Sequence, residues 1–163
     1  MKKIFVIVFC LITCISNAQT EVKKLYDPSA NAKKDIKAAV KKAKAENKYV
    51  LIQCGGNWCT WCIEFERFCK SYPKIDSVIN ASFVWYHLNT SKENKNDKTF
   101  AKYRYPQRFG FPVFLVLNQK GKLIHTQNSI YFEDGKKSYD KTKVLSFLEM
   151  WSPGALNPKM YKE

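Results

Sequence analysis

The chain has 163 residues, of which 45% are hydrophobic and 26% are charged, and its formal net charge is +14 at pH 7. This length is typical of one domain and suffices to bury a hydrophobic core. The lysines are dispersed instead of forming a nucleic-acid-binding motif, so the charge favours solubility and a weak attraction to acidic partners. Nucleic acid is not an expected partner, and a specific site for an anionic surface is the less favoured interpretation.

The first eighteen residues have the features of an export signal. Two lysines in residues 1–3 precede an apolar run over residues 4–12, and small residues at 16–18 come directly before Gln19. A positive start, a short apolar run and small residues before the cleavage point are typical of a secretory signal peptide. The sequence therefore predicts a cleaved signal peptide over residues 1–18.

Export implies a periplasmic or extracellular domain over residues 19–163. The apolar run is shorter than the about 20 residues that a membrane span needs, and no other segment is predicted to cross a bilayer. A lipid anchor on Cys14 is the alternative to simple cleavage. Export leaves four of the six cysteines in a compartment where disulfides persist. These are Cys54, Cys59, Cys62 and Cys69.

The first half of the domain alternates helical and extended patterns. Apolar residues at helical spacing predict an amphipathic helix over about 31–46, and a near-continuous apolar run predicts a buried strand over 49–54. A second helix is expected over about 59–70. A short helix is expected around residues 75–79, after Pro73, and the apolar run 83–88 predicts the next strand.

The second half ends in a hairpin and a helix. A helical turn or two is expected within 99–105, and a strong strand over 113–117 is joined by a turn to a returning strand over 122–126. The last helix is expected over 140–151. Alternation followed by a hairpin predicts an α/β fold, with a central mixed sheet flanked by helices on both faces and a core over about 31–151.

A pair of cysteines lies where the first strand turns into the second helix. Cys59 and Cys62 are separated by two residues, which places both in the first helical turn, where free N–H groups and the helix dipole stabilise a thiolate. Cys59 is expected to be the exposed attacking thiol, and Cys62 the shielded thiol that resolves a mixed disulfide. A fixed structural disulfide is the alternative.

The four cysteines also match a metal-binding spacing. Cys54, Cys59 and Cys62 follow the spacing of plant-type iron–sulfur proteins, with Cys69 as the fourth ligand, and structural zinc is a related option. However, Cys54 ends an apolar strand and Cys69 lies on the inward face of a helix. We therefore expect no metal and no cofactor besides the redox-active pair. A second disulfide between Cys54 and Cys69 is the alternative to two free thiols, but a helix rise of about 15 Å separates Cys69 from the end of the strand. We expect both to be buried free thiols.

The motif over residues 55–62, Gly-Gly-Asn-Trp-Cys-Thr-Trp-Cys, resembles thioredoxin-like proteins, and more narrowly their exported bacterial branch. A second mark of this family is Gly-Phe-Pro-Val over residues 110–113. The resemblance covers about residues 35–151. It implies a cis peptide bond before Pro112, beside the dithiol, and pairing of the Phe111 backbone with an extended substrate.

Two tryptophans flank the expected dithiol. Trp58 precedes Cys59, and Trp61 precedes Cys62. Both are candidate substrate-binding residues, together with Phe111 and Pro112. If Trp61 is partly exposed, it forms an apolar platform for peptides. The alternative is that the Trp61 side chain packs onto the domain.

The chain departs from thioredoxin itself in three features, which involve four residues. Thr60-Trp61 stands where thioredoxin has Gly-Pro between its cysteines, so the redox potential cannot be transferred. Gln53 stands where thioredoxin has a buried aspartate. Because an amide cannot accept a proton as a carboxylate does, base assistance to Cys62 must come from another source or be weaker. Ile63 replaces the usual basic residue and removes one local positive charge.

The sequence thus predicts an exported thiol–disulfide oxidoreductase that exchanges disulfides with protein or peptide thiols through Cys59 and Cys62. It is expected to be a monomer that an unidentified redox partner recycles. The competing hypothesis is a non-catalytic binding module in which Cys59–Cys62 is structural. His87 and His125 are interpreted as structural residues. The sequence leaves open whether the protein is a reductant, an oxidant or an isomerase.

Overall fold

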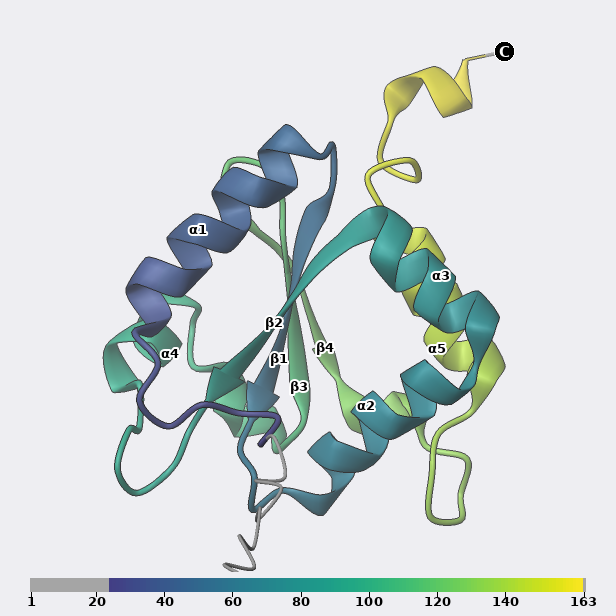
Figure 1. The fold of residues 1–163 in the computed structure, drawn as a ribbon. Coiled ribbons are helices and arrows are strands. Elements are labelled where there is room, and N and C mark those ends of the chain that lie inside the picture. Colours follow the sequence, from purple (N-terminus) through teal and green to yellow (C-terminus); the bar gives the residue numbers. More distant parts are fainter. Residues whose placement is uncertain (1–23, 163) are drawn as a thin grey trace, which may run out of the picture.

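The computed structural model describes residues 24–162 (Figure 1). The predicted signal peptide and the alternative lipid anchor at Cys14 lie outside the described residues. Within residues 24–162, no helix combines the length and the apolar character that crossing a membrane requires.

A four-stranded mixed sheet forms the centre of the molecule, in the spatial order β2-β1-β3-β4. The central strand β1 pairs in parallel with β2 and antiparallel with β3, and β3 pairs antiparallel with β4. The predicted mixed sheet is therefore confirmed. The strands are β1 Tyr49–Gly55, β2 Phe83–Asn89, β3 Val113–Leu117 and β4 Leu123–Asn128.

Helices cover both faces of this sheet. In Figure 1, α1 and α4 lie on one side, and α2, α3 and α5 lie on the other. The α-helices are α1 Ala32–Ala45, α2 Thr60–Ser71, α3 Pro73–Ser82, α4 Asp97–Lys102 and α5 Lys141–Met150. Short 3-10 helices are η1 Pro106–Phe109, η2 Ser129–Phe132 and η3 Pro158–Tyr161.

The alternation of side chains along β1 and β3 creates two hydrophobic cores. Leu51 and Phe114 point into the core beneath α2, α3 and α5, whereas Ile52 and Leu115 belong to the core beneath α1. Successive residues of a strand point to opposite faces, so a strand that is buried on both sides is apolar throughout. This explains the near-continuous apolar runs in the sequence.

Several element boundaries differ from the sequence-based predictions. Helix α4 begins at Asp97 and ends at Lys102, because Arg104 and Tyr105 adopt positive φ angles of 63° and 55°, which a helix cannot continue. Helix α3 is longer than predicted, since Pro73 occupies its first turn, where a missing N–H costs nothing. Strand β4 starts and ends later than expected, extending to Asn128 in its pairing with β3.

Candidate active site

The two predicted cysteines form a disulfide where β1 leads into α2. Cys59 and Cys62 are bonded, with a Cα–Cα distance of 5.2 Å. Cys59 is the N-cap of α2, which begins at Thr60, one residue later than predicted, and the Cys59 Sγ accepts a hydrogen bond from the Cys62 N–H at 3.2 Å. The sulfur of Cys59 thus lies at the positive end of the helix dipole, where a thiolate is stabilised.

The disulfide is more buried than the sequence suggested. Cys59 is only 6% exposed and Cys62 is fully buried, so the expectation of an exposed Cys59 is wrong for the disulfide form. Both sulfurs belong to a small cluster with Tyr26, against which Trp61 and Phe111 pack. Cys59 is still the more accessible of the two cysteines, as expected if Cys59 is the attacking thiol and Cys62 the resolving thiol.

Gly55 and Gly56 allow the close approach of the disulfide and the tryptophan to the backbone. A Cβ on Gly55 would overlap Cys62 Sγ and would lie 2.8 Å from the Tyr26 hydroxyl oxygen. A Cβ on Gly56 would overlap the Trp58 indole nitrogen and would lie 2.6 Å from the Thr90 carbonyl oxygen. The absence of side chains at both positions therefore makes room for the site.

The two tryptophans have different environments. Trp58 is 59% exposed, and its indole N–H donates a hydrogen bond to the Thr90 carbonyl oxygen at 2.7 Å. Trp61 is partly buried and packs edge-on against Tyr139, whose hydroxyl donates to the Trp61 carbonyl oxygen at 2.9 Å. Most of the Trp61 side chain therefore packs onto the domain. Trp58 is the tryptophan that presents an exposed apolar surface.

The segment around Pro112 lies beside the disulfide. The Phe111–Pro112 peptide bond is cis, and Pro112 is buried. Directly after it, Val113 pairs with Cys54 at the carboxyl end of β1. The Phe111 ring meets the Trp58 ring edge-on, with 5.5 Å between the centroids. This arrangement brings together all four residues that the sequence singled out around the dithiol.

A groove of about 470 Å³ opens next to Trp58 and Phe111. Phe100 contributes a further apolar wall, and Lys92 and Lys95 lie on its border. Its volume is within the range of ligand pockets, about 300–1,000 Å³. Phe111 lines this groove and also packs against the disulfide cluster.

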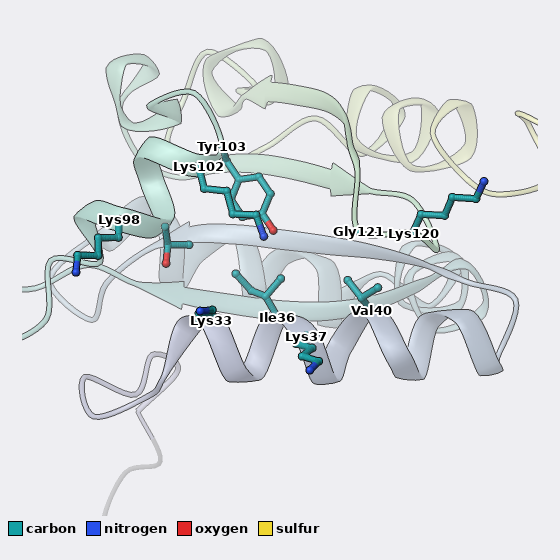
Figure 2. A pocket seen from close by; sticks show the side chains of 10 residues that line it. Lys33, Ile36, Lys37, Val40, Lys98, Lys102, Tyr103, Lys120 and Gly121 are labelled. Carbon is teal, nitrogen blue, oxygen red and sulfur yellow. The ribbon is translucent and has the colours of Figure 1, made fainter.

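A second cavity lies elsewhere on the molecule, between α1, α4 and the β3–β4 turn (Figure 2). It has a volume of about 360 Å³, and it is lined by an apolar floor that includes Ile36 and Tyr103. Five lysine side chains surround this floor: Lys33, Lys37, Lys98, Lys102 and Lys120. None of its lining residues belongs to the disulfide cluster, so this cavity is separate from the candidate redox site.

Sequence reasoning missed Tyr26, which lies in the lead-in segment, residues 24–31, directly before α1. Tyr26 is fully buried against the disulfide. Its N–H donates to Asn57 Oδ1 at 3.0 Å, and its carbonyl oxygen accepts from Asn57 Nδ2 at 2.7 Å. The only available signal was a single aromatic residue directly before Asp27-Pro28, which does not indicate a contact with a loop 31 residues away.

Gln53 connects Tyr26 to the second cysteine. The side chain is fully buried, and its Nε2 donates to the Tyr26 hydroxyl oxygen at 2.8 Å and to the Cys62 carbonyl oxygen at 2.9 Å. The other side-chain atom, Gln53 Oε1, is buried without a hydrogen-bond partner among the described residues. The position of thioredoxin's buried aspartate is therefore occupied by an amide that donates hydrogen bonds.

Cys54 and Cys69 are free and buried, as predicted. They lie in different hydrophobic cores, Cys54 beneath α1 and Cys69 beneath α3 and α5. Burial raises the pKa of both thiols above the ordinary value. Within residues 24–162, no group of three or more His, Cys, Asp or Glu side chains is arranged to hold a metal ion. The four cysteines do not form the ligand set that an iron–sulfur cluster would require.

The close approach at Gly55 predicts that Gly55→Ala destabilises the oxidised protein. The added methyl group overlaps Cys62 Sγ, and overpacking of this kind costs about 1–3 kcal/mol in the free energy of unfolding. Denaturant unfolding measures the loss. Gly154→Ala is the control, because the nearest atom to its Cβ is Ser152 Oγ at 3.8 Å. Equal stability of the two variants would contradict the packing described for Gly55.

The burial of Cys54 and Cys69 predicts their reactivity toward iodoacetamide. In the folded, oxidised protein both remain unmodified, because the reagent is excluded and the raised pKa keeps the thiols protonated. Unfolding without a reductant exposes both to alkylation, whereas Cys59 and Cys62 react only after reduction. Peptide mapping by mass spectrometry assigns each site. Rapid labelling of Cys54 or Cys69 in the folded protein would show that the cores are arranged differently.

Comparison with known proteins agrees with this architecture. Residues 36–134 match the family model described as a thioredoxin-like domain. The structure is similar to that of a disulphide isomerase from Xylella fastidiosa Temecula1, with a TM-score of 0.68 and 23% identity over 78% of this chain and 96% of that one. A thioredoxin from Thermus thermophilus gives a TM-score of 0.50, with 19% identity over 70% of this chain and 81% of the other. These likenesses support the fold.

Two curated relatives share part of the sequence. The thiol:disulfide interchange protein DsbD of Salmonella typhimurium is 29% identical over 80 residues, which are 49% of this chain and 14% of that protein. DsbD of Klebsiella pneumoniae is 26% identical over 80 residues, 49% of this chain and 13% of the relative. The similarity thus covers a small part of each relative. Together with the family match and the Cys59–Cys62 pair, it shows that the chain belongs to the thioredoxin-like domain family.

Proposed function

We propose that this protein is an exported thiol–disulfide oxidoreductase that exchanges disulfides with protein or peptide thiols. The observation that carries the proposal is the Cys59–Cys62 disulfide at the N-terminus of α2. A helix N-terminus lowers the pKa of a thiol and so provides an attacking thiolate near neutral pH. The name of the DsbD relatives, thiol:disulfide interchange protein, supports the same chemistry.

The exchange proceeds through two sulfur displacements. In the reduced protein, the Cys59 thiolate attacks one sulfur of a substrate disulfide, which forms a mixed disulfide and releases the other substrate sulfur as a thiolate. The Cys62 thiolate then attacks Cys59 Sγ, which forms the Cys59–Cys62 bond and releases the second substrate thiolate. Two electrons pass from the protein to the substrate. The reverse sequence oxidises a substrate dithiol, and both directions need no cofactor besides the two sulfurs.

Substrate binding is assigned to the groove beside the disulfide. Trp58 supplies an exposed apolar face, the Phe111 backbone is proposed to pair with an extended peptide, and Pro112 positions that backbone beside the sulfurs. Trp61 contributes through its remaining exposed edge. The working unit is proposed to be a monomer that a separate redox partner recycles.

Export rests on the N-terminal sequence. The positive start, the apolar run and the small residues over 1–18 support removal of a signal peptide and action in the periplasm or outside the cell. An oxidising compartment would supply disulfide-bonded protein substrates.

One observation favours the alternative, a binding module with a structural disulfide. Cys59 is only 6% exposed in the oxidised form, and attack on its sulfur requires access. Binding of a peptide in the groove beside Trp58 and Phe111 would have to give a substrate sulfur access to Cys59. The two functions therefore differ in whether the disulfide turns over.

Cysteine variants test the oxidoreductase directly. Cys59→Ser is expected to abolish insulin reduction, because no attacking thiolate remains at the start of α2. Cys62→Ser is expected to accumulate mixed disulfides with substrate proteins, because the resolving thiol is lost. Non-reducing gels and mass spectrometry detect these adducts, and Cys69→Ser is the control in which turnover continues. Unchanged turnover in Cys59→Ser would refute the mechanism.

A further inference from the structure

Tyr26 lies against the disulfide but has no part in the exchange described above. We propose that, in the reduced protein, the Tyr26 hydroxyl donates a hydrogen bond to the Cys62 thiolate and stabilises it for attack on Cys59. The inference rests on the proposed oxidoreductase function and assigns the group that assists the resolving cysteine.

The backbone of Tyr26 is fixed to the loop that carries the dithiol. Asn57 accepts a hydrogen bond from the Tyr26 N–H at 3.0 Å and donates one to the Tyr26 carbonyl oxygen at 2.7 Å. Asn57 lies two residues before Cys59 in the sequence. This pair of hydrogen bonds holds the lead-in segment at the redox site and directs the phenol ring into the cluster with Cys59 and Cys62.

The hydrogen of the Tyr26 hydroxyl is available for donation. Gln53 Nε2 donates to the hydroxyl oxygen at 2.8 Å, so the oxygen acts as acceptor in that bond. The hydroxyl and Cys62 Sγ both face the backbone of Gly55, where one added Cβ would overlap the sulfur and lie 2.8 Å from the hydroxyl oxygen. The two groups therefore occupy neighbouring space on the same side of β1.

When the disulfide is reduced, the Cys62 thiolate requires a hydrogen-bond donor. Cys62 is fully buried, and a buried anion is unfavourable unless hydrogen bonds compensate for lost water. Gln53 already directs its amide to Tyr26 and to the Cys62 carbonyl oxygen, and the Tyr139 hydroxyl donates to the Trp61 carbonyl oxygen. Among the described residues of the disulfide cluster, Tyr26 carries the uncommitted hydroxyl hydrogen.

The Tyr26 hydroxyl acts as a hydrogen-bond donor and keeps its proton. Burial raises the pKa of Tyr26 well above its ordinary value, so the phenol stays neutral throughout the working pH range. Four ionisable groups besides the dithiol lie near it: Cys54, Glu66, His87 and Tyr139. The His87 ring meets the Tyr26 ring edge-on, with 5.5 Å between centroids, and His87 Nε2 lies 3.2 Å from a Glu66 carboxylate oxygen. The Tyr26→Phe substitution removes none of these four groups.

The test compares Tyr26→Phe with Tyr103→Phe, both made in a Cys59→Ser background. Tyr103 is also a buried tyrosine but lies in the core beneath α1, so its variant removes a tyrosine hydroxyl away from the disulfide cluster. NMR of the Cys62 Cβ follows the titration of this one thiol. Tyr26→Phe is expected to move its titration midpoint upward by about one pH unit, since a hydrogen bond to an anion is lost. Tyr103→Phe is expected to leave the midpoint unchanged.

A kinetic readout uses the protein with both cysteines. Below the midpoint, Tyr26→Phe reduces the fraction of Cys62 thiolate about tenfold, and the greater nucleophilicity of the more basic thiolate offsets part of this loss. Release of the mixed disulfide in a single turnover is therefore expected to slow about threefold. Formation of the mixed disulfide by Cys59 supplies the internal control.

Asn57→Ala supplies a second variant that keeps the Tyr26 hydroxyl but removes its anchor. Its Cys62 midpoint is expected to move in the same direction as in Tyr26→Phe. Equal midpoints in Tyr26→Phe and Tyr103→Phe would overturn the inference, even if the enzyme is active. Failure of the proposed function has a different outcome, because Cys59→Ser would then leave disulfide exchange unchanged.

Discussion

The contact between Cys62 Sγ and the backbone of Gly55 determines how the site is built. Strand β1 is held on both sides by β2 and β3, so its carboxyl end has a fixed position. Because Gly55 has no side chain, the first turn of α2 lies directly against that end, with Cys62 Sγ next to Gly55. A side chain at Gly55 would force α2 away from the sheet.

Three other segments meet at the same end of the sheet. The residue after β2, Thr90, receives the Trp58 indole hydrogen bond, and Pro112 lies directly before β3. The lead-in segment inserts Tyr26 from the side of α1. Parallel pairing of β1 with β2 and antiparallel pairing with β3 place the end of β2 and the start of β3 beside the end of β1. The topology thus assembles the site from distant parts of the chain.

Local patterns in the sequence predicted much of this arrangement. The apolar runs of β1 and β3 identified the central strands, and the spacing of Cys59 and Cys62 after β1 identified the dithiol. These features depend on neighbouring residues, so they are visible in the sequence. The exposure of Trp58 and the packing of Trp61 were not predictable, because both aromatic residues suit either environment and Tyr139, which covers Trp61, lies 78 residues away.

Tyr26 shows the limit of sequence reasoning most clearly. Its position depends on two hydrogen bonds to Asn57 and one to Gln53, and no periodic pattern encodes such contacts. Gln53 was recognised as a departure from thioredoxin. The hydrogen bond from Gln53 to the Tyr26 hydroxyl is visible only in the structure. The boundary of α4 was missed for a similar reason, since the left-handed conformations of Arg104 and Tyr105 are not specified by residue type.

Disulfide exchange requires a Cys59–Cys62 bond that opens and closes, and the reduction potential of this couple measures that property most directly. Equilibration with glutathione buffers, followed by mass spectrometry of alkylated peptides, gives the potential for this pair alone. An oxidoreductase is expected to have a value within the range of catalytic dithiols, about −270 to −120 mV. A value below about −300 mV, typical of structural disulfides, would refute the exchange mechanism and favour the binding module.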